Sequence, residues 1–364
     1  MREVDFISDG YSSGAGAGAS SSTKSKSVGG LMDFTPPEMQ RTDISPAVLQ
    51  LKALGIDDVL HFDFLSPPPV DSMVFALELL YSLHALDDQC RITAMGTAMA
   101  EMPVDPRIAH MLLRSFDFGC GEEALSIAAM CSVEYPFINI RSRGGSGSAS
   151  EARDKLQKDS ESFVVQHSDH LTLLRIYQSF VESGCNQSWC DSISLQYKIL
   201  HRAHEIRKNL RSVLLRCRRL VVQQQQQQHR QSSSSSSSQV GITSSSSSTS
   251  ADTGCAGSGG DDGGGEVVLA SCGEDYISLR KCLVAGFFSH AARLGHDGQY
   301  HTLRGRVTVA PHPQSVVAKH GAPPEWVVYN EVQLSKDNPL LREVTYIDPR
   351  WLDEIAPHYY VLNF

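Results

Sequence analysis

The sequence predicts an α+β protein of several domains, in which helical units precede a small C-terminal β-barrel. Apolar residues recur every three or four positions through about residue 222, which is the period of an amphipathic helix. From Gln299 onward the period becomes two, and Gly, Pro and Asn separate short β-rich segments. Low-complexity stretches divide these blocks. Together the patterns favour separate helical and β units.

Three segments offer almost no apolar surface to offset the entropy of ordering the backbone, so we expect them to be disordered. The first is the N-terminal segment 1–34, whose residues 11–30 are mostly Gly, Ala, Ser and Lys. The second is a Gly/Ser loop over 141–151, and the third is a Gln/Ser/Gly insert over 223–275.

A winged-helix unit is expected over 70–133, after a linker at 35–69 that holds one short helix. Asp71 is the expected N-cap of a helix through His84, and Arg91-Ile92-Thr93 is the expected short strand. Asp105 followed by proline marks a further helix start, because the side chain caps the helix and proline lacks only an N–H that would be unpaired there.

A helical bundle is expected over 134–222, and a closing helix over 276–298. Asp169 is the predicted N-cap of one helix, and a longer helix is predicted from about Asp191 to Val222 with one apolar stripe.

The barrel is expected over 299–364 and to be of OB type, since four or five short strands in this length fit that class. Its predicted strands are Tyr300–Leu303, Arg306–Ala310, Trp326–Leu334 and Leu341–Ile347, followed by a helix at Pro349–Ile355.

Charge, cysteine content and hydrophobicity argue against several classes of function. The formal net charge is −9, which argues against tight autonomous binding of nucleic acid. The nine cysteines include no Cys-x-x-Cys pair, which favours free thiols in a reducing compartment. No apolar run has the length of a membrane span, so we expect a soluble intracellular protein without a membrane partner.

Several blocks resemble the C-terminal accessory region of DEAH-box RNA helicases. They are Thr35–Arg41, Ile92–Pro106, Asp169–Thr172, His312–Ser315, Trp326–Glu331 and Thr345–Leu352, in the family's order. One departure is Ser168, which stands where the family usually has glycine. The resemblance is nearest to spliceosome-associated members, which implies a role in pre-mRNA splicing in the nucleus.

The resemblance implies that the bundle is the family's helical ratchet, and that the three units wall a tunnel for single-stranded RNA against ATP-driven motor domains. The barrel positions carried over for RNA binding are His312, Ser315, Arg342 and Thr345. Implied partners are single-stranded RNA, the motor domains, activators with a glycine-rich patch, and spliceosome proteins.

The motifs that bind and hydrolyse ATP are not found in the sequence. There is no G-x-x-x-x-G-K-[ST], no Asp-Glu-Ala-His and no arginine finger, so we predict no catalytic or cofactor-binding residues. ATP and Mg²⁺ would belong to the family's motor. The chain is therefore expected to be inactive alone, whether it is a fragment, a truncated gene model, or a partner of a motor on another polypeptide.

A basic helix face is a further candidate for RNA. Eight Lys or Arg residues lie between Lys198 and Arg219 against the single acid Glu205. They form either an ordinary solvated face or a face that contacts phosphates, with Arg207, Lys208 and Arg211 as the candidates.

A zinc site is the weaker interpretation of Cys185, Cys190, His201 and His204, because their spacing differs from that of a Cys₂His₂ site. We predict no metal.

Two other functions stay open. One is a winged-helix regulator that binds DNA, although its expected recognition helix within 94–116 holds only Arg107 and Arg114 as cations. The other is a catalytically inactive scaffold or regulator descended from a helicase.

Overall fold

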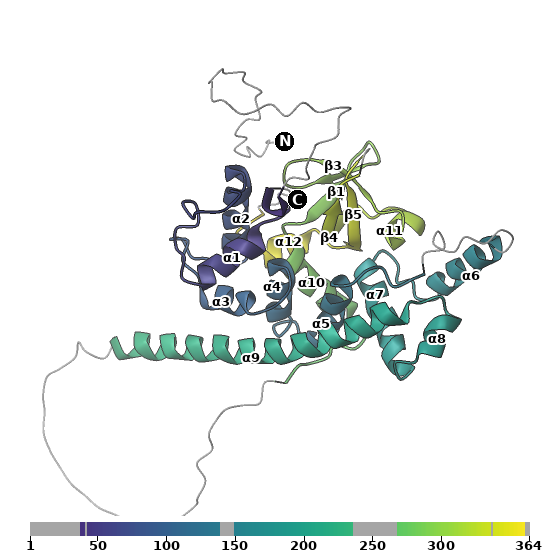
Figure 1. Ribbon diagram of the computed structural model, residues 1–364, viewed down its shortest axis with the longest axis horizontal. Coiled ribbons are helices and arrows are strands. Elements are labelled where there is room, and N and C mark those ends of the chain that lie inside the picture. Colours follow the sequence, from purple (N-terminus) through teal and green to yellow (C-terminus); the bar gives the residue numbers. More distant parts are fainter. Residues whose placement is uncertain (1–36, 41, 139–148, 236–267, 336–337, 361–364) are drawn as a thin grey trace, which may run out of the picture.

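The computed structural model describes residues 37–40, 42–138, 149–235, 268–335 and 338–360 of the chain (Figure 1). The segment 1–34 and most of the loop and insert predicted as disordered lie outside these residues. The helix α6 (Ala149–Glu161) begins inside the loop predicted over 141–151. Among the described helices, none is long and apolar enough to cross a membrane.

The N-terminal part is helical. After the 3₁₀ turn η1 (Glu38–Gln40), its helices are α1 (Ser45–Ala53), α2 (Val70–Ser82), α3 (Ala94–Ala100), α4 (Pro106–Arg114) and α5 (Gly121–Cys131). Asp105 caps α4 as predicted, since its carboxylate accepts from the Arg107 amide. Asp71 does not cap α2, because the N-cap is Pro69 and Asp71 lies inside the first turn. The short strand predicted at Arg91-Ile92-Thr93 is reduced to one bridge, between Leu86 and Ile92.

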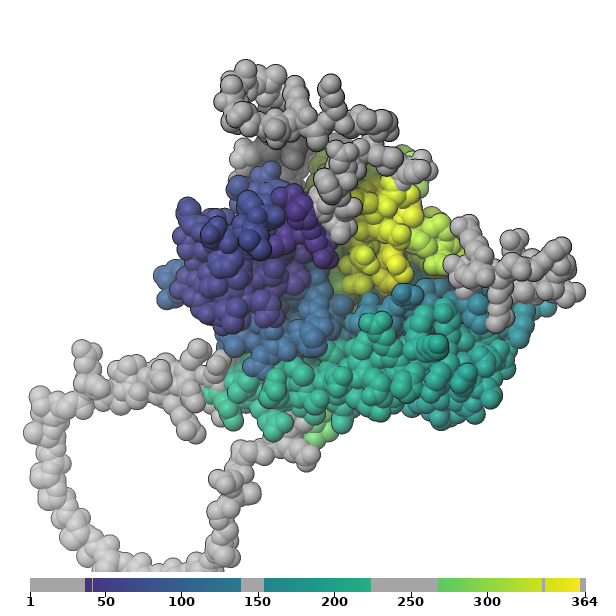
Figure 2. Space-filling model, in the orientation of Figure 1, coloured from purple at the N-terminus to yellow at the C-terminus, as the bar shows by residue number. Residues whose placement is uncertain are grey.

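The middle of the chain forms α7 (Asp169–Glu182), α8 (Gln187–Ser192) and α9 (Tyr197–Ser235). With 39 residues, α9 is about 58 Å long and runs beneath α3, α5 and α7 along one side of the molecule (Figures 1 and 2). The predicted stripe is present, with Ala203 and Leu210 fully buried. The predicted bounds are wrong at both ends, because α8 is a separate helix and α9 extends past Val222 through the glutamine tract.

The C-terminal part is the expected closed five-stranded barrel, with the strand order β1-β2-β3-β5-β4. Its elements are β1 (Ala291–Leu294), β2 (Tyr300–Thr302), β3 (Thr308–Pro311), α11 (Val316–Lys319), β4 (Trp326–Gln333), β5 (Leu340–Tyr346) and α12 (Arg350–Ile355). The pair β3–β5 is parallel and the other pairs are antiparallel. The first strand contradicts the closing helix predicted over 276–298, because α10 (Tyr276–Phe287) ends before it.

The helix α10 lies at the centre of the molecule and joins the barrel to the helices. It packs against α4, α5, α12 and β4, and its residues Leu279, Leu283 and Phe287 are buried in the largest apolar core. The crossing with α4 depends on Gly286. A Cβ there would lie 2.6 Å from the Met111 Cβ and 2.9 Å from the Arg107 carbonyl oxygen. The two helix backbones therefore approach more closely than any other residue would allow.

We predict that Gly286→Ala destabilises the protein by about 1–3 kcal/mol, because the added methyl group clashes with α4 at the crossing. Alanine favours a helix more than glycine does, but this gain is smaller than the cost of the clash. Ile277→Ala, at an exposed position of the same helix, should change the free energy of unfolding by less than about 0.5 kcal/mol. Urea unfolding followed by circular dichroism measures both. Equal stabilities would contradict the close crossing.

Candidate functional site

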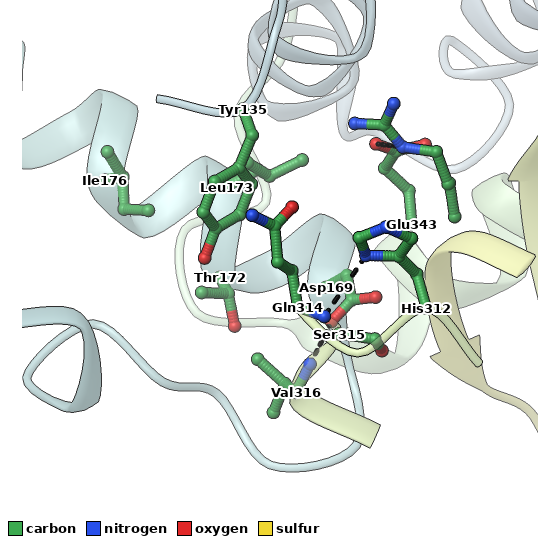
Figure 3. Close-up of a pocket in the computed structure, with 11 residues that line it drawn as sticks. Tyr135, Asp169, Thr172, Leu173, Ile176, His312, Gln314, Ser315, Val316 and Glu343 are labelled. Carbon is green, nitrogen blue, oxygen red and sulfur yellow. Dashed lines mark hydrogen bonds and ion pairs between the residues drawn. The ribbon is translucent and has the colours of Figure 1, made fainter. Parts of the chain in front are cut away.

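A buried carboxylate ties α7 to the barrel. Ser168, not the predicted Asp169, caps α7, with its hydroxyl accepting from the Leu171 amide. Asp169 is the first helical residue, and its side chain reaches the barrel. One oxygen accepts from the Val316 amide at 2.7 Å (Figure 3). The other accepts from the Val344 amide at 2.8 Å. This contact fixes the position of the helical unit relative to β5 and α11.

A second buried group of polar residues lies beside this carboxylate. The Thr345 hydroxyl is 2.8 Å from the Ser168 hydroxyl and 2.8 Å from Nδ1 of His170. All three residues have no solvent-exposed surface. The Tyr346 amide also donates to the His167 carbonyl, so the segment before α7 pairs with β5 through its backbone.

Burial controls the charges here. It raises the pKa of Asp169, whereas bonds from the Ser315 hydroxyl and the two barrel amides lower it. Burial lowers the pKa of His170 to about 3, so this imidazole is neutral at physiological pH. The junction therefore depends on oriented hydrogen bonds rather than on an ion pair.

A pocket opens at this junction, and we call it the seam pocket. Figure 3 shows its walls, which α7 and the segment after α5 form on one side and β5 and the β3–α11 loop on the other. It is lined by Tyr135, Asp169, Thr172, Leu173, Ile176, His312, Gln314, Ser315, Val316, Arg342 and Glu343. An imidazole, a phenol, an amide and a guanidinium thus share one opening with an apolar wall. Such a set can stack on a planar group and pair with an anion.

Glu343 is the unusual member of the seam pocket. Its backbone has φ 50°, in the left-handed region that non-glycine residues seldom adopt. Burial raises the pKa of its carboxyl to about 7, against the opposing effects of Arg342 and of the bond from Asn330. The Arg342 Nε lies 3.7 Å from this carboxyl. The negative charge beside Arg342 therefore changes near neutral pH.

The four barrel residues predicted to bind RNA meet at this junction but differ in access. His312 and Arg342 are partly exposed and line the seam pocket. Ser315 is 5% exposed and caps α11, and Thr345 is fully buried. Ser315 and Thr345 are thus placed to hold the site rather than to touch a ligand.

The three predicted residues of α9 lie elsewhere and make ion pairs. Arg207 packs onto α5, where it donates to the Ser126 hydroxyl at 2.9 Å and pairs with Glu122. Arg211 pairs with the same carboxylate at 3.4 Å. Lys208 is exposed and pairs with Glu205 at 2.9 Å. Two of the three residues predicted to contact phosphate, Arg207 and Arg211, therefore hold α9 against α5.

The weak zinc pattern is not brought together as a ligand set. His204 Nδ1 is 2.8 Å from the Tyr177 hydroxyl, and Cys190 is buried. Within the described ranges, no group of three His, Cys, Asp or Glu side chains could hold a metal ion.

The sequence reasoning missed Tyr135, Gln314 and Glu343 as members of the pocket. Gln314 lies inside the quoted block His312–Ser315, so that block held a signal for it. Glu343 is adjacent to the predicted Arg342, but its left-handed backbone conformation inside β5 is not predicted by strand alternation. Tyr135 reaches the site from a loop, and no pattern in the sequence marks it.

The fold and this junction define a helicase-associated region that ends in an OB barrel, and family models match the three units. The helicase-associated winged-helix domain matches 76–104, the helicase-associated ratchet-like domain matches 105–173, and the oligonucleotide/oligosaccharide-binding fold matches 279–359. The ratchet-like match thus begins at α4, so α4 and α5 fall outside the winged-helix match, although we expected both in that unit.

Individual relatives point to one family. The chain is 38% identical over 328 residues to the probable ATP-dependent RNA helicase DHX35 of Homo sapiens, which covers 90% of this chain and 38% of the relative. For the protein of the same name from Pongo abelii, the values are 37%, 90% and 37%. The chain therefore contains the helicase-associated C-terminal domains of a DEAH-box RNA helicase, and it spans less than two fifths of the length of these relatives.

We predict that Asp169→Asn destabilises the protein by about 2–3 kcal/mol, because one carboxylate oxygen becomes an amide NH₂ facing a buried backbone donor. The control is Asp275→Asn at the exposed N-cap of α10. Asparagine caps a helix about as well as aspartate, so the melting temperature of this variant should not change. Thermal unfolding measures both variants. Similar melting temperatures would show that the Asp169 contact does not hold the junction.

We predict that Glu343→Gln stabilises the protein above pH 7 but not near pH 5. The carboxyl has a pKa of about 7 in the folded protein against an ordinary value of 4.5, so its contribution to stability is lost as pH rises through that window. The gain near pH 8 should reach at most about 3 kcal/mol. Denaturant unfolding at several pH values measures it, and a difference independent of pH would contradict the raised pKa.

Proposed function

We propose that these domains guide single-stranded RNA for an ATP-driven motor, and that the strand passes the seam pocket. The observation that carries the proposal is that His312, Gln314 and Arg342 of the barrel open toward Tyr135 of the helical unit at one rigid junction. A strand held by two domains at once would be aligned along their boundary. The OB fold and the helicase relatives support nucleic acid as the ligand.

The chemistry suits an unpaired strand. The Arg342 guanidinium can pair with a phosphate, and the rings of His312 and Tyr135 offer flat faces for unstacked bases. Such contacts tolerate any sequence because every base has a π-face. A net charge of −9 keeps the chain's own affinity low, so binding would depend on these few local groups.

Two other barrel residues support the strand indirectly. Ser315 caps α11, whose first residues form part of the pocket wall, and Thr345 anchors Ser168 and His170. We assign them a positioning role. On α9, Lys208 is the proposed contact of the basic face, because it is exposed while Arg207 and Arg211 brace α5.

The wider role rests on resemblance. We propose that the motor domains of a DEAH-box helicase supply ATP and Mg²⁺ chemistry, and that the assembly acts in pre-mRNA splicing in the nucleus. Activators with a glycine-rich patch and spliceosome proteins are the proposed regulatory partners. The similarity of the sequence to spliceosome-associated helicases supports these assignments.

We predict that His312→Ala combined with Arg342→Gln weakens binding of a labelled 12-nucleotide oligouridine at least tenfold in fluorescence anisotropy. The variant should also reduce the slope of log affinity against log salt by about 0.7, because one phosphate contact is lost. The melting temperature should change little, since both side chains are partly exposed.

The control is Arg293→Gln, which removes the same charge from an exposed barrel arginine paired with Glu325. Its RNA affinity should match that of the unchanged protein. Equal losses for control and test variants would indicate a diffuse charge effect and overturn the assignment of the seam pocket. Lys208→Glu in the same assay tests α9, and an unchanged affinity would remove that helix from the RNA path.

A further inference from the structure

A larger concavity of about 840 Å³ lies beside the seam pocket, between the N-terminal helices and β4. We call it the acidic hollow and define it by the carboxylates of Asp43, Asp71, Asp105 and Glu331, which are among its lining residues. Its volume is in the range of ligand sites in proteins. The proposed RNA path uses none of these residues.

One cation is built into the wall of the hollow. The Arg107 side chain is only 5% exposed and lies 3.0 Å from Asp43 and 3.3 Å from Asp105. Its Nε has no hydrogen-bond partner within the described ranges. Burial acts to raise the pKa of Asp43, but the Arg107 charge and the hydrogen bonds from Ser45 and Arg107 together outweigh it, so the pKa of this carboxyl is lowered. These three residues therefore form a fixed, charged wall.

The other two carboxylates are exposed. Asp71 lies in the first turn of α2, and Glu331 lies on β4. Neither Asp71 nor Glu331 forms an ion pair with a Lys, Arg or His side chain of the described residues. Four carboxylates against one guanidinium leave the hollow with a formal charge of about −3. Such a charge repels a phosphate backbone, so RNA is a poor occupant.

Exposed apolar side chains lie on α2, and one of them lines the hollow. Phe75 lines the hollow and is 38% exposed, with Val74 and Val70 at 44% and 70% on the same helix. Single exposed apolar residues are ordinary, but three on one helix beside a charged concavity form a mixed surface. Since no described set of acidic side chains could chelate a metal ion, a bare cation does not match the arrangement.

We propose that the acidic hollow docks a protein segment carrying lysine or arginine together with apolar side chains. Its cations would pair with Asp71 and Glu331. Its apolar side chains would pack on the part of Phe75 left exposed beside the Arg304 guanidinium, which lies 5.0 Å from the centre of that ring. This protein-docking site is independent of the proposed RNA path.

The probe is a fluorescein-labelled nine-residue peptide of alternating lysine and leucine, with a glutamate–leucine peptide as its negative control. The intact chain should bind the lysine peptide and not the glutamate peptide, and added salt should weaken the binding. Asp71→Asn with Glu331→Gln should weaken it at least tenfold. Because neither side chain forms an ion pair with another of the described residues, the melting temperature should not change.

The matched control is Asp117→Asn with Glu325→Gln, which removes two carboxylates at exposed positions outside the hollow. Its affinity for the peptide should stay within twofold. Equal losses in the two double variants, or no binding of the lysine peptide, would overturn the proposal. Peptide binding that emerges only after removal of residues 1–30 would assign the hollow to Lys24 and Lys26 of the same chain, and would also overturn it.

The RNA assay separates the two sites. Asp71→Asn with Glu331→Gln should leave oligouridine affinity unchanged, and His312→Ala with Arg342→Gln should leave peptide affinity unchanged. A loss of RNA binding in the hollow variant would make the hollow part of the RNA path and overturn protein docking. If the seam-pocket variant does not weaken RNA binding, the proposed RNA path is wrong, but the peptide-binding result still stands.

Discussion

The structure depends on one buried carboxylate that two domains share. Asp169 opens α7, yet both of its oxygens accept from barrel amides, at Val316 and Val344. A buried carboxyl without these donors would be costly, so the barrel has to sit where its amides meet the helix. Hydrogen bonds are directional, and apolar packing alone would let the domains slide. The seam pocket owes its shape to this constraint.

Several basic side chains of α9 form ion pairs with other helices of the fold and are therefore not free to bind a ligand. A basic run on a helix with an apolar opposite face predicts cations that are free to bind phosphate. In the folded chain, Glu122 of α5 forms ion pairs with Arg207 and Arg211, and Glu101 forms one with Arg216 at 2.8 Å. These partners lie 85 to 115 positions away in sequence, so helix periodicity could not reveal them.

Local patterns predicted much of the fold and less of the site. Helix periodicity gave the stripe of α9, and alternation gave the strands from Tyr300 onward. The strand β1 was missed because Ala291–Leu294 follows an apolar helix without a break in composition. The resemblance placed Ser315 and Thr345 in the right region, but their burial depends on contacts with α7 that are far away in sequence. The solvent exposure of a side chain depends on tertiary contacts, which local sequence patterns do not predict.

Electrostatics divides the junction into two neighbouring surfaces. Glu331 and Arg342 are cross-strand partners in the β4–β5 ladder, yet Glu331 lines the acidic hollow and Arg342 lines the seam pocket. Between them, Asn330 on the hollow side donates to Glu343 on the pocket side at 3.4 Å. Glu343 lines the seam pocket and is not part of the hollow's lining, and burial raises the pKa of its carboxyl to about 7. As pH rises through 7, the ionised carboxyl would oppose a phosphate beside Arg342, so the charge of the seam pocket depends on pH.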